Sequence, residues 1–262
     1  MSRRMQRLGA LALGSTLAVA GIVIGCGDPG SPQASGVVAL NFATKPALAA
    51  KAAPRQALIS GSETFAIGGD TLVVTKVELV LKHVKFEALG DSVACDDSTG
   101  GDEDCHELVA GPFLADLPLG GGVARQFSVT VQPGTYGELD FQIHAAANGT
   151  GDGGFLAAHP DLRGVSVRVS GTFNKTPFLF ATNIEAEQEQ EFEPPIAVNP
   201  GSELDVTLLV DLGSWFLDDT GTALLDPSTA SKGSATQRLV DQNIRRSFRA
   251  FRDDDRDGTN DD

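Results

Sequence analysis

Basic residues are scarce in this 262-residue chain: 20 lysines and arginines stand against 35 aspartates and glutamates, a formal net charge of −15 at pH 7. A surface of that sign repels nucleic acid and anionic lipid headgroups, so we expect neither as a partner. Tryptophan and tyrosine occur once each, which argues against a carbohydrate platform built on aromatic stacking. The sequence also lacks His-Glu-x-x-His, Gly-x-Ser-x-Gly and a glycine-rich phosphate loop. We therefore expect a protein that is not an enzyme.

A cryptic hydrolase is the enzymatic alternative. The four histidines lie far apart in the sequence, but His106, His144 and His159 could converge in the folded chain, with Asp140 or Asp211 beside them. Both aspartates lie on predicted strands, where a solvent-facing position is the commoner outcome.

An export signal opens the chain. Three arginines among the first seven residues precede an uncharged apolar run over residues 8–24. The run ends in Val23-Ile24-Gly25-Cys26, which resembles the lipobox of bacterial lipoprotein precursors. The resemblance implies that residues 1–25 are removed and that Cys26 carries a diacylglyceryl group and an acylated amine. By the sorting rule of such proteins, Gly27 after the cysteine favours the outer membrane.

An uncleaved transmembrane helix is the alternative for this stretch. The apolar run has 17 residues, at the lower limit of what spans a bilayer, and continues into Gly-Asp-Pro-Gly without a stop-transfer pattern. A lipid anchor is therefore favoured. Without residues 1–25 the chain keeps 17 basic against 35 acidic residues, a net charge of −18.

Beyond a flexible tether at residues 26–35, alternating apolar residues predict a β-sandwich domain over residues 36–236. Residues 45–61 are expected to form a surface connection. The predicted strands cover residues 36–44, 71–87, 125–132, 138–144, 165–173, 177–184, 190–198 and 203–212.

Local patterns refine these strands. The face of strand 71–87 that is expected to be buried begins with Val73, Thr75, Val77, Leu79 and Leu81. At Lys82-His83 the alternation slips, which predicts a bulge or bend; His83 could be a ligand, but a partly buried residue at an irregularity explains it as well. Pro133-Gly134 predicts a tight hairpin, and Pro194-Pro195 predict a strand at a sheet edge.

One amphipathic helix is predicted over residues 237–252. Its apolar stripe consists of Val240, Ile244, Phe248 and Phe251. We expect this stripe to pack on the sandwich near Trp215 and Phe216. A peripheral membrane helix is the weaker alternative, because acidic residues follow at once.

Three segments resemble uncharacterised bacterial surface lipoproteins that have a domain of unknown function with a prealbumin-like or immunoglobulin-like sandwich. They are Leu72-Val-Val-Thr-Lys-Val-Glu-Leu-Val-Leu, Val131-Gln-Pro-Gly-Thr-Tyr-Gly-Glu-Leu-Asp-Phe and Val206-Thr-Leu-Leu-Val-Asp-Leu-Gly-Ser-Trp-Phe. The resemblance covers roughly residues 36–216. It implies an antiparallel β-sandwich and an envelope location, and it supplies no reaction. Residues 91–107 form an inserted loop in this chain.

That inserted loop holds two of the three cysteines. With Cys26 lipidated in an oxidising compartment, Cys95 and Cys105 are predicted to form a disulfide. Closing a loop of about ten residues would stabilise the fold by just under ~3 kcal/mol. A zinc site of Cys95, Cys105 and His106 is the alternative, but a paired Cys-x-x-Cys is missing.

The acidic tail, residues 253–262, fits Asp-x-Asp-x-Asp-Gly and resembles the first half of EF-hand and thrombospondin type 3 calcium loops. Calcium prefers carboxylates at alternate positions when a glycine lets the chain turn sharply. The predicted ligands are the side chains of Asp253, Asp255 and Asp257, the carbonyl of Thr259, and a direct or water-bridged oxygen of Asp261. The loop lacks the twelfth-position glutamate, and Arg256 opposes binding. A solvated acidic tail that meets the arginines before it is the alternative.

Together these features predict a lipid-anchored envelope protein with a binding or structural role. Its partner would be a glycan, a peptide or a neighbouring envelope protein, recognised by the loops at 91–107 and 148–154. A structural or assembly lipoprotein ordered by calcium is the second hypothesis.

Overall fold

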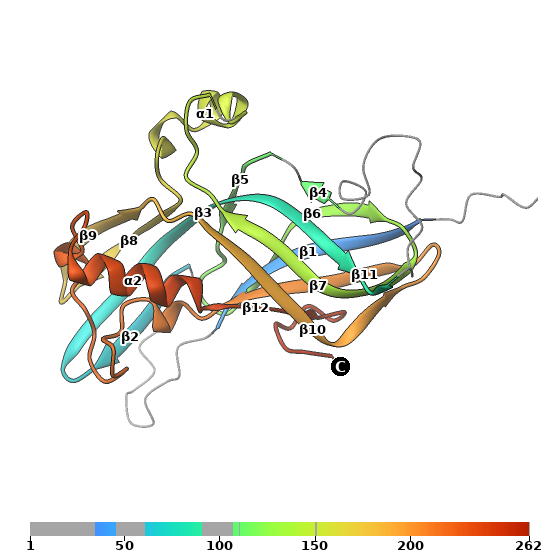
Figure 1. Cartoon of the computed structure of the whole chain (residues 1–262). Coiled ribbons are helices and arrows are strands. Elements are labelled where there is room, and N and C mark those ends of the chain that lie inside the picture. Colours follow the sequence, from blue (N-terminus) through green and yellow to red (C-terminus); the bar gives the residue numbers. More distant parts are fainter. Residues whose placement is uncertain (1–34, 46–60, 91–106, 110, 150, 262) are drawn as a thin grey trace, which may run out of the picture. The chain divides into compact units, whose positions relative to one another are not determined.

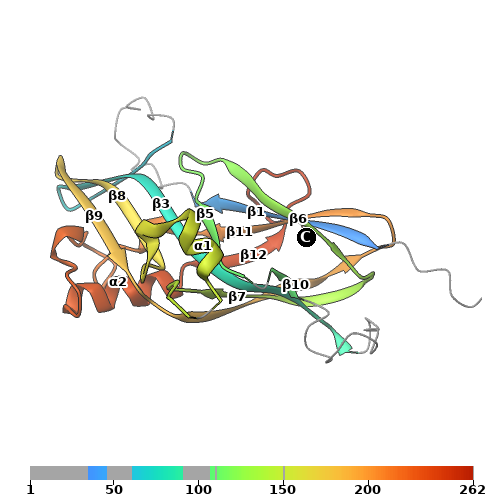
Figure 2. The same ribbon diagram turned by 90° about the horizontal axis from the view of Figure 1, so that it is seen from above.

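Strands of alternating apolar residues fold this chain into two β-sheets that share one hydrophobic core (Figures 1 and 2). The computed structural model describes residues 35–45, 61–90, 107–149 except 110, and 151–261. They all belong to one compact unit, Gln33–Asp262. The predicted fold class, a mainly β antiparallel sandwich with a C-terminal helix, is confirmed.

The smaller sheet has four strands in the order β12–β11–β1–β6. The pairing of β1 with β11 is parallel, and the other two pairings are antiparallel. The bounds are β1 (Gly36–Thr44), β6 (Val123–Val131), β11 (Glu203–Val210) and β12 (Phe248–Arg252).

The larger sheet has eight strands in the order β10–β7–β3–β8–β9, and three further strands also pair with β3. Strand β10, which contains Pro194 and Pro195, lies at the edge of this sheet, as predicted. The bounds are β2 (Glu63–Ile67), β3 (Asp70–Ala88), β4 (Glu107–Val109), β5 (Phe113–Asp116), β7 (Gly134–Ile143), β8 (Val167–Phe173), β9 (Thr176–Thr182) and β10 (Ala186–Val198).

The described helices are α1 (Gly153–Ala158) and α2 (Ala235–Arg245), with short 3-10 turns η3 (Pro160–Leu162), η4 (Leu212–Ser214) and η5 (Pro227–Thr229). Within the part of the chain that the structure describes, no helix has both the length and the apolar character needed to cross a membrane.

The core forms where alternate residues of both sheets face each other. In β1 and β11 the predicted inward residues are confirmed. These buried residues are Val38, Leu40, Phe42, Leu204, Val206, Leu208 and Val210. Each such side chain contributes roughly 1.5–3 kcal/mol relative to an exposed position, so both central strands add to the hydrophobic stabilisation of the sandwich.

Strand β3 is irregular at two points. The predicted slip at Lys82-His83 is confirmed, because His83 has a positive φ of 51° and the register with β7 shifts there. A second shift, between Val74 and Lys76 in the pairing with β8, was not predicted. It turns Leu72 and Val74 inward, whereas the alternation in the sequence predicts Val73 and Thr75 on that face. A bulge exchanges the inward-facing and outward-facing positions of a strand, and the spacing of apolar residues in the sequence does not reveal where this happens.

The predicted hairpin at Pro133-Gly134 is wrong. Strand β6 pairs with β1 in the smaller sheet, whereas β7 pairs with β3 and β10 in the larger sheet. The Pro-Gly segment therefore carries the chain from one sheet to the other instead of joining two paired strands.

The predicted helix over residues 237–252 is correct only in its first part, because α2 ends at Arg245 and β12 begins at Phe248. Ser247 lies between them: its hydroxyl donates to the Ile244 carbonyl oxygen at 2.7 Å and accepts from Trp215 Nε1 at 2.8 Å. The predicted stripe is buried throughout, and α2 packs near Trp215 as expected.

An excursion between β7 and β8, which includes α1 and η3, covers part of the outer side of the larger sheet. Val80 of β3, Ala146, Leu156 and Leu162 form a second buried apolar cluster there. This cluster fixes the excursion against β3 and positions the polar residues at its base.

Candidate functional site

The chain turns back on itself after β12, and the predicted acidic tail is an ordered loop over residues 253–261. The loop begins at Asp253, whose backbone N–H donates to the Asp205 carbonyl oxygen at 3.0 Å and so extends the pairing of β12 with β11. Although it is an aspartate, Asp253 is fully buried. Its Oδ2 accepts a hydrogen bond of 2.6 Å from the hydroxyl of Thr207 in β11.

Asp253 also closes the loop from inside. Its Oδ1 accepts the backbone N–H of Asp257 at 3.0 Å, and its Oδ2 accepts that of Gly258 at 3.2 Å. Gly258 has a φ of 81°, which side chains with a Cβ rarely adopt. At the far end Asp261 N donates to the Arg252 carbonyl oxygen at 3.1 Å. The backbone therefore forms a closed ring around its own carboxylates.

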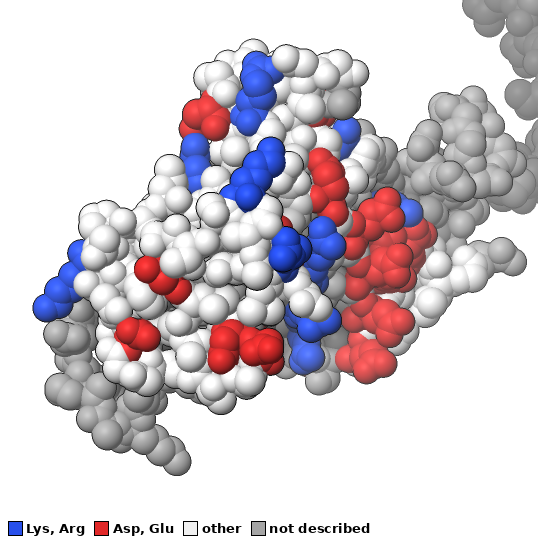
Figure 3. All heavy atoms as spheres, turned by 60° about the vertical axis from the view of Figure 1, so that its left-hand side comes forward, with Lys and Arg blue, Asp and Glu red and all other residues white. Residues whose placement is uncertain are grey.

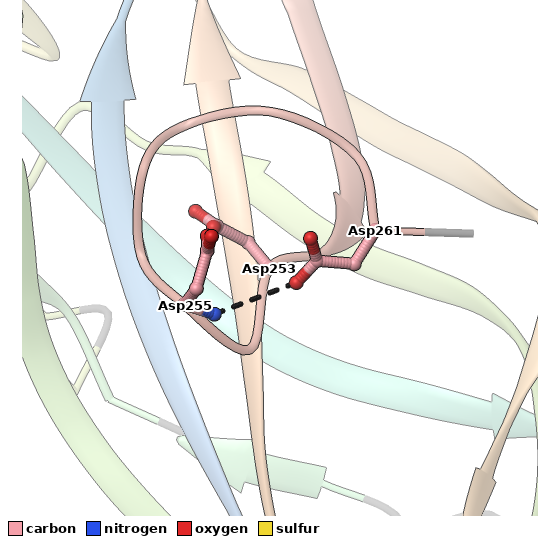
Figure 4. A group of neighbouring side chains, drawn as sticks. All are labelled: Asp253, Asp255 and Asp261. Carbon is pink, nitrogen blue, oxygen red and sulfur yellow. Dashed lines mark hydrogen bonds between the residues drawn. The ribbon is translucent and has the colours of Figure 1, made fainter.

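Three of these carboxylates converge. One oxygen from each of Asp253, Asp255 and Asp261 lies within 4.8 Å of the other two (Figure 4). The dashed line in Figure 4 joins Asp255 N to Asp261 Oδ2, 3.4 Å apart. Oxygens bound to one calcium ion at roughly 2.3–2.6 Å are at most about 5 Å apart, so the spacing fits a shared ion. Asp255 and Asp261 are exposed, which leaves room for water ligands.

The other two predicted ligands behave differently. Asp257 lies outside the convergent group, and its Oδ1 accepts the N–H of Thr259 at 2.8 Å and also the Thr259 hydroxyl. A role for the Thr259 carbonyl stays a prediction. The residues present therefore fit a calcium ion bound by three aspartates more closely than the predicted set of five.

Arg256 does not face the three carboxylates. Its Nε lies 3.0 Å from Asp205 Oδ1, and its φ of 57° turns the chain accordingly. Arg125 of β6 contacts the same oxygen through Nη2 at 3.1 Å. Asp205 thus neutralises Arg256, which was predicted to oppose a cation.

Asn41 of β1 is the direct partner of Thr207 in β11, so its side chain lies on the same face of the smaller sheet as that of Thr207. It is fully buried, and its Nδ2 donates to Asp205 Oδ1 at 2.9 Å. Its Oδ1, however, is buried and has no hydrogen-bond partner among the described residues. Sequence reasoning did not find Asn41, because its relation to the loop depends on the parallel pairing of β1 with β11.

A second polar group lies at the base of the α1 excursion. His144 Nε2 is 2.8 Å from Oδ2 of Asp152, which is fully buried, and His144 Nδ1 is 3.3 Å from Glu185 Oε2. Lys82 Nζ lies 3.5 Å from Asp152 Oδ1. Both ring nitrogens face carboxylates, and only the imidazolium can donate to both. These contacts fasten the excursion to β3 and β7.

The residues of the hydrolase hypothesis are placed differently. His144 has Asp152 and Glu185 as its partners, not Asp140 or Asp211. Asp140 pairs with Lys85 at 3.5 Å, and Asp211 pairs with Lys45 at 2.9 Å. His159 stacks on Phe155, with ring centroids 4.9 Å apart. Asp152 and Glu185 were missed, because nothing in their sequence neighbourhood links them to a histidine.

The predictions for the cysteines lie outside the described residues. Cys26, Cys95, Cys105 and His106 all belong to stretches that the structure does not describe. The lipid anchor, the disulfide and the zinc alternative therefore stay predictions. The same holds for most of the 91–107 loop.

Acidic side chains gather densely in one area of the face shown in Figure 3. On the larger sheet, the register of β10, β7 and β3 brings several acidic side chains into neighbouring positions. Glu138 of β7 lies directly between Glu191 of β10 and Glu87 of β3. In the next row, Asp140 lies between Glu189 and Lys85.

This crowding changes the protonation of Glu138. Partial burial, together with the charges of Asp140 and of the two neighbouring glutamates of β10, raises the pKa of Glu138 to about 7. Like charges directly opposite each other in a sheet are destabilising, so this area lowers stability at neutral pH.

Comparison of the chain with known protein families, with curated proteins and with solved structures gives no match.

Proposed function

We propose that this chain is a lipid-anchored protein of the cell envelope, directed to the outer membrane, with a binding or structural role rather than an enzymatic one. The observation that carries the proposal is the sequence of three arginines, an uncharged apolar run and Val23-Ile24-Gly25-Cys26. A sandwich that follows a short polar tether is an arrangement suited to display at a membrane surface.

The positions of the aromatic residues bear on the kind of partner. Trp215 and Tyr136 are both almost completely buried, so neither offers a surface on which a sugar ring could stack. The large hydrophobic side chains exposed on the described part of the chain are Leu89 and Leu179, one on each of two separate segments. Of the partners considered, a neighbouring envelope protein therefore fits better than a glycan.

Metabolic labelling with palmitate tests the anchor. The full-length chain, expressed in a bacterium, is expected to take up the label and to partition with the membrane fraction. Cys26→Ser should lose the label and stay at precursor size, whereas Cys95→Ser, which removes a different thiol, should be labelled normally. An unlabelled wild-type chain, or a Cys26→Ser variant that matures and fractionates like the wild type, would contradict the proposal.

A structural role ordered by calcium is the second candidate, and the convergence of Asp253, Asp255 and Asp261 favours it. Calcium would bring the positive charge that three neighbouring carboxylates require. It would hold the end of the chain against the smaller sheet. With three carboxylates and no bidentate glutamate, we expect weak binding, with a Kd on the order of 10⁻⁴–10⁻³ M.

Calorimetric titration of the full-length chain in detergent with calcium chloride tests this candidate. The wild type should release or absorb heat at millimolar calcium, and its melting temperature should fall when a chelator is added. Asp255→Asn should weaken binding by roughly tenfold or more. Asp254→Asn, which removes the same charge from the same loop but outside the group of three, should bind like the wild type. Absence of a binding signal in the wild type would eliminate the calcium site.

A further inference from the structure

We propose that Asn41 Oδ1 is a fourth protein ligand of the calcium ion held by Asp253, Asp255 and Asp261, so that the ion fastens the C-terminal loop to strand β1. The inference rests on the calcium site proposed above. Asn41 is far from the acidic motif in the sequence and comes near it only through the fold.

The first observation is an unsatisfied oxygen. Asn41 is fully buried, and its amide is held in one orientation because Nδ2 donates to Asp205 Oδ1 at 2.9 Å. A flipped amide would place an oxygen against that carboxylate, so the orientation is the chemically reasonable one. Oδ1 then has no hydrogen-bond partner among the described residues. Buried polar atoms nearly always have a partner, so this one calls for an explanation.

The second observation places Asn41 on the face of the smaller sheet that the loop covers. Asn41 is the direct partner of Thr207 in the parallel pairing of β1 with β11, so the two side chains project from the same face. On that face the Thr207 hydroxyl donates to Asp253 Oδ2 at 2.6 Å. The loop continues over β1: a Cβ added at Gly258 would lie 3.8 Å from the Cβ of Ala43, two residues along from Asn41.

The chemistry of the group indicates the ligand class. An amide oxygen is one of the hard ligands that calcium takes alongside carboxylates, and calcium needs more oxygens than three aspartates supply. The arginines that could otherwise balance the charge are engaged elsewhere: Arg256 and Arg125 contact Asp205, and Arg252 contacts Asp254. A divalent cation would therefore satisfy the orphan oxygen and the converging carboxylates together.

The test compares calcium affinities of full-length chains in detergent by calorimetric titration. Asn41→Ala should weaken calcium binding by roughly tenfold or more, as Asp255→Asn does. Asn243→Ala, which removes an asparagine that donates to the carbonyls of Trp215 and Leu217, should leave the affinity unchanged. If Asp255→Asn loses binding while Asn41→Ala keeps wild-type affinity, the calcium site stands and Asn41 is not a ligand. If the wild type itself fails to bind, both proposals fall.

A spectroscopic measurement on the wild-type chain covers the case in which Asn41→Ala does not fold. Asparagine labelled with carbon-13 at Cγ gives one signal for each asparagine, and the Asn41 signal is identified by its loss in Asn41→Asp. Calcium should shift the Asn41 signal and leave that of Asn243 in place. A signal that stays in place while calcium binds would show that Asn41 is not a ligand.

Discussion

Thr207 Oγ1 donates a hydrogen bond of 2.6 Å to Asp253 Oδ2, although the two residues lie 46 positions apart in the sequence. The bond joins the middle of β11 to the first residue after β12, and both partners are fully buried. It makes the acidic segment after β12 a part of the folded domain instead of a free tail.

Replacement of Asp253 tests this role. Asp253→Ala would leave the buried Thr207 hydroxyl and the half-buried N–H of Gly258 without their acceptor, whereas the N–H of Asp257 would keep Asp255 Oδ1 at 3.2 Å. Since an unsatisfied buried group costs about 1–3 kcal/mol, we expect the free energy of unfolding to fall by about that amount, measured by urea unfolding in the presence of a chelator. Asp254→Ala, at an exposed position in the same loop, should change the free energy of unfolding by less than about 0.5 kcal/mol. Equal effects of the two variants would contradict a buried anchoring role.

The acidic rows on the larger sheet predict a dependence on pH. The pKa of Glu138 is raised from 4.5 to about 7, so the folded state holds its proton more tightly than the unfolded state. The stability that this group contributes is therefore fully present below pH 4.5 and is lost as the pH rises toward 7. Glu138→Gln should raise the free energy of unfolding at pH 8 by about 0.2–1 kcal/mol and should have no effect at pH 4.

Urea unfolding at pH 4, 6 and 8 measures this effect. Glu193→Gln serves as the control, because it makes the same change of charge on β10 outside the rows opposite Glu138. A gain from Glu138→Gln that is the same at pH 4 and pH 8 would refute the proposed cause.

Glu78 of β3 predicts the opposite trend. Arg168 of β8 binds both of its carboxylate oxygens, at 2.5 and 2.8 Å, and with Lys76 it lowers the pKa of Glu78 below 4.5. This contribution is present above pH 4.5 and is lost as the pH falls through the lower pKa of the folded state. Glu78→Gln should lower the free energy of unfolding by roughly 3 kcal/mol at pH 7 and by less in acid.

Thermal unfolding of Glu78→Gln at pH 7 and pH 3 measures that difference. Asp161→Asn removes the other, exposed carboxylate partner of Arg168 and should have little effect at either pH. Similar losses for the two variants would mean that burial of Glu78 does not matter.

Gly171 of β8 allows a steric prediction. A Cβ at this position would lie 2.0 Å from the backbone oxygen of Val73, which cannot move without disturbing β3. Gly171→Ala should therefore destabilise the fold by about 1–3 kcal/mol or more, measured by urea unfolding. Gly154→Ala provides the contrast: a Cβ there meets nothing within 4 Å, and we expect a gain of about 0.4–1 kcal/mol in α1. A neutral Gly171→Ala variant would show that the two strands can separate at this point.

Period-two alternation was sufficient to locate β1, β11 and most of β3, because an apolar side chain at every second position leaves little freedom of register. It could not reveal that β6 and β7 belong to different sheets, since a Pro-Gly segment between two strands looks the same in either case. Nor could it locate the end of α2. Val240, Ile244 and Phe248 suit one continuous helix, and the break coincides with a contact between Ser247 and Trp215, which is distant in the sequence.

For the loop after β12, too, the sequence predicted some features and not others. The spacing of aspartates around Gly258 was visible in the sequence and indicated converging carboxylates. Its partners in the sheet, Thr207 and Asn41, were not visible, because only the pairing of β1, β11 and β12 brings them together. The ion pair of Arg256 with Asp205 was not visible in the sequence either, because Asp205 lies on β11.

The position of β1 has a mechanical consequence for a chain tethered at its N-terminus. Since β1 lies between β11 and β6, hydrogen bonds hold it along both edges from Gly36 to Thr44. A pull along the strand would load these bonds together, in shear, instead of opening them one after another. A protein anchored through Cys26 would thus transmit tension from the membrane to a central strand of its smaller sheet, which is paired on both sides.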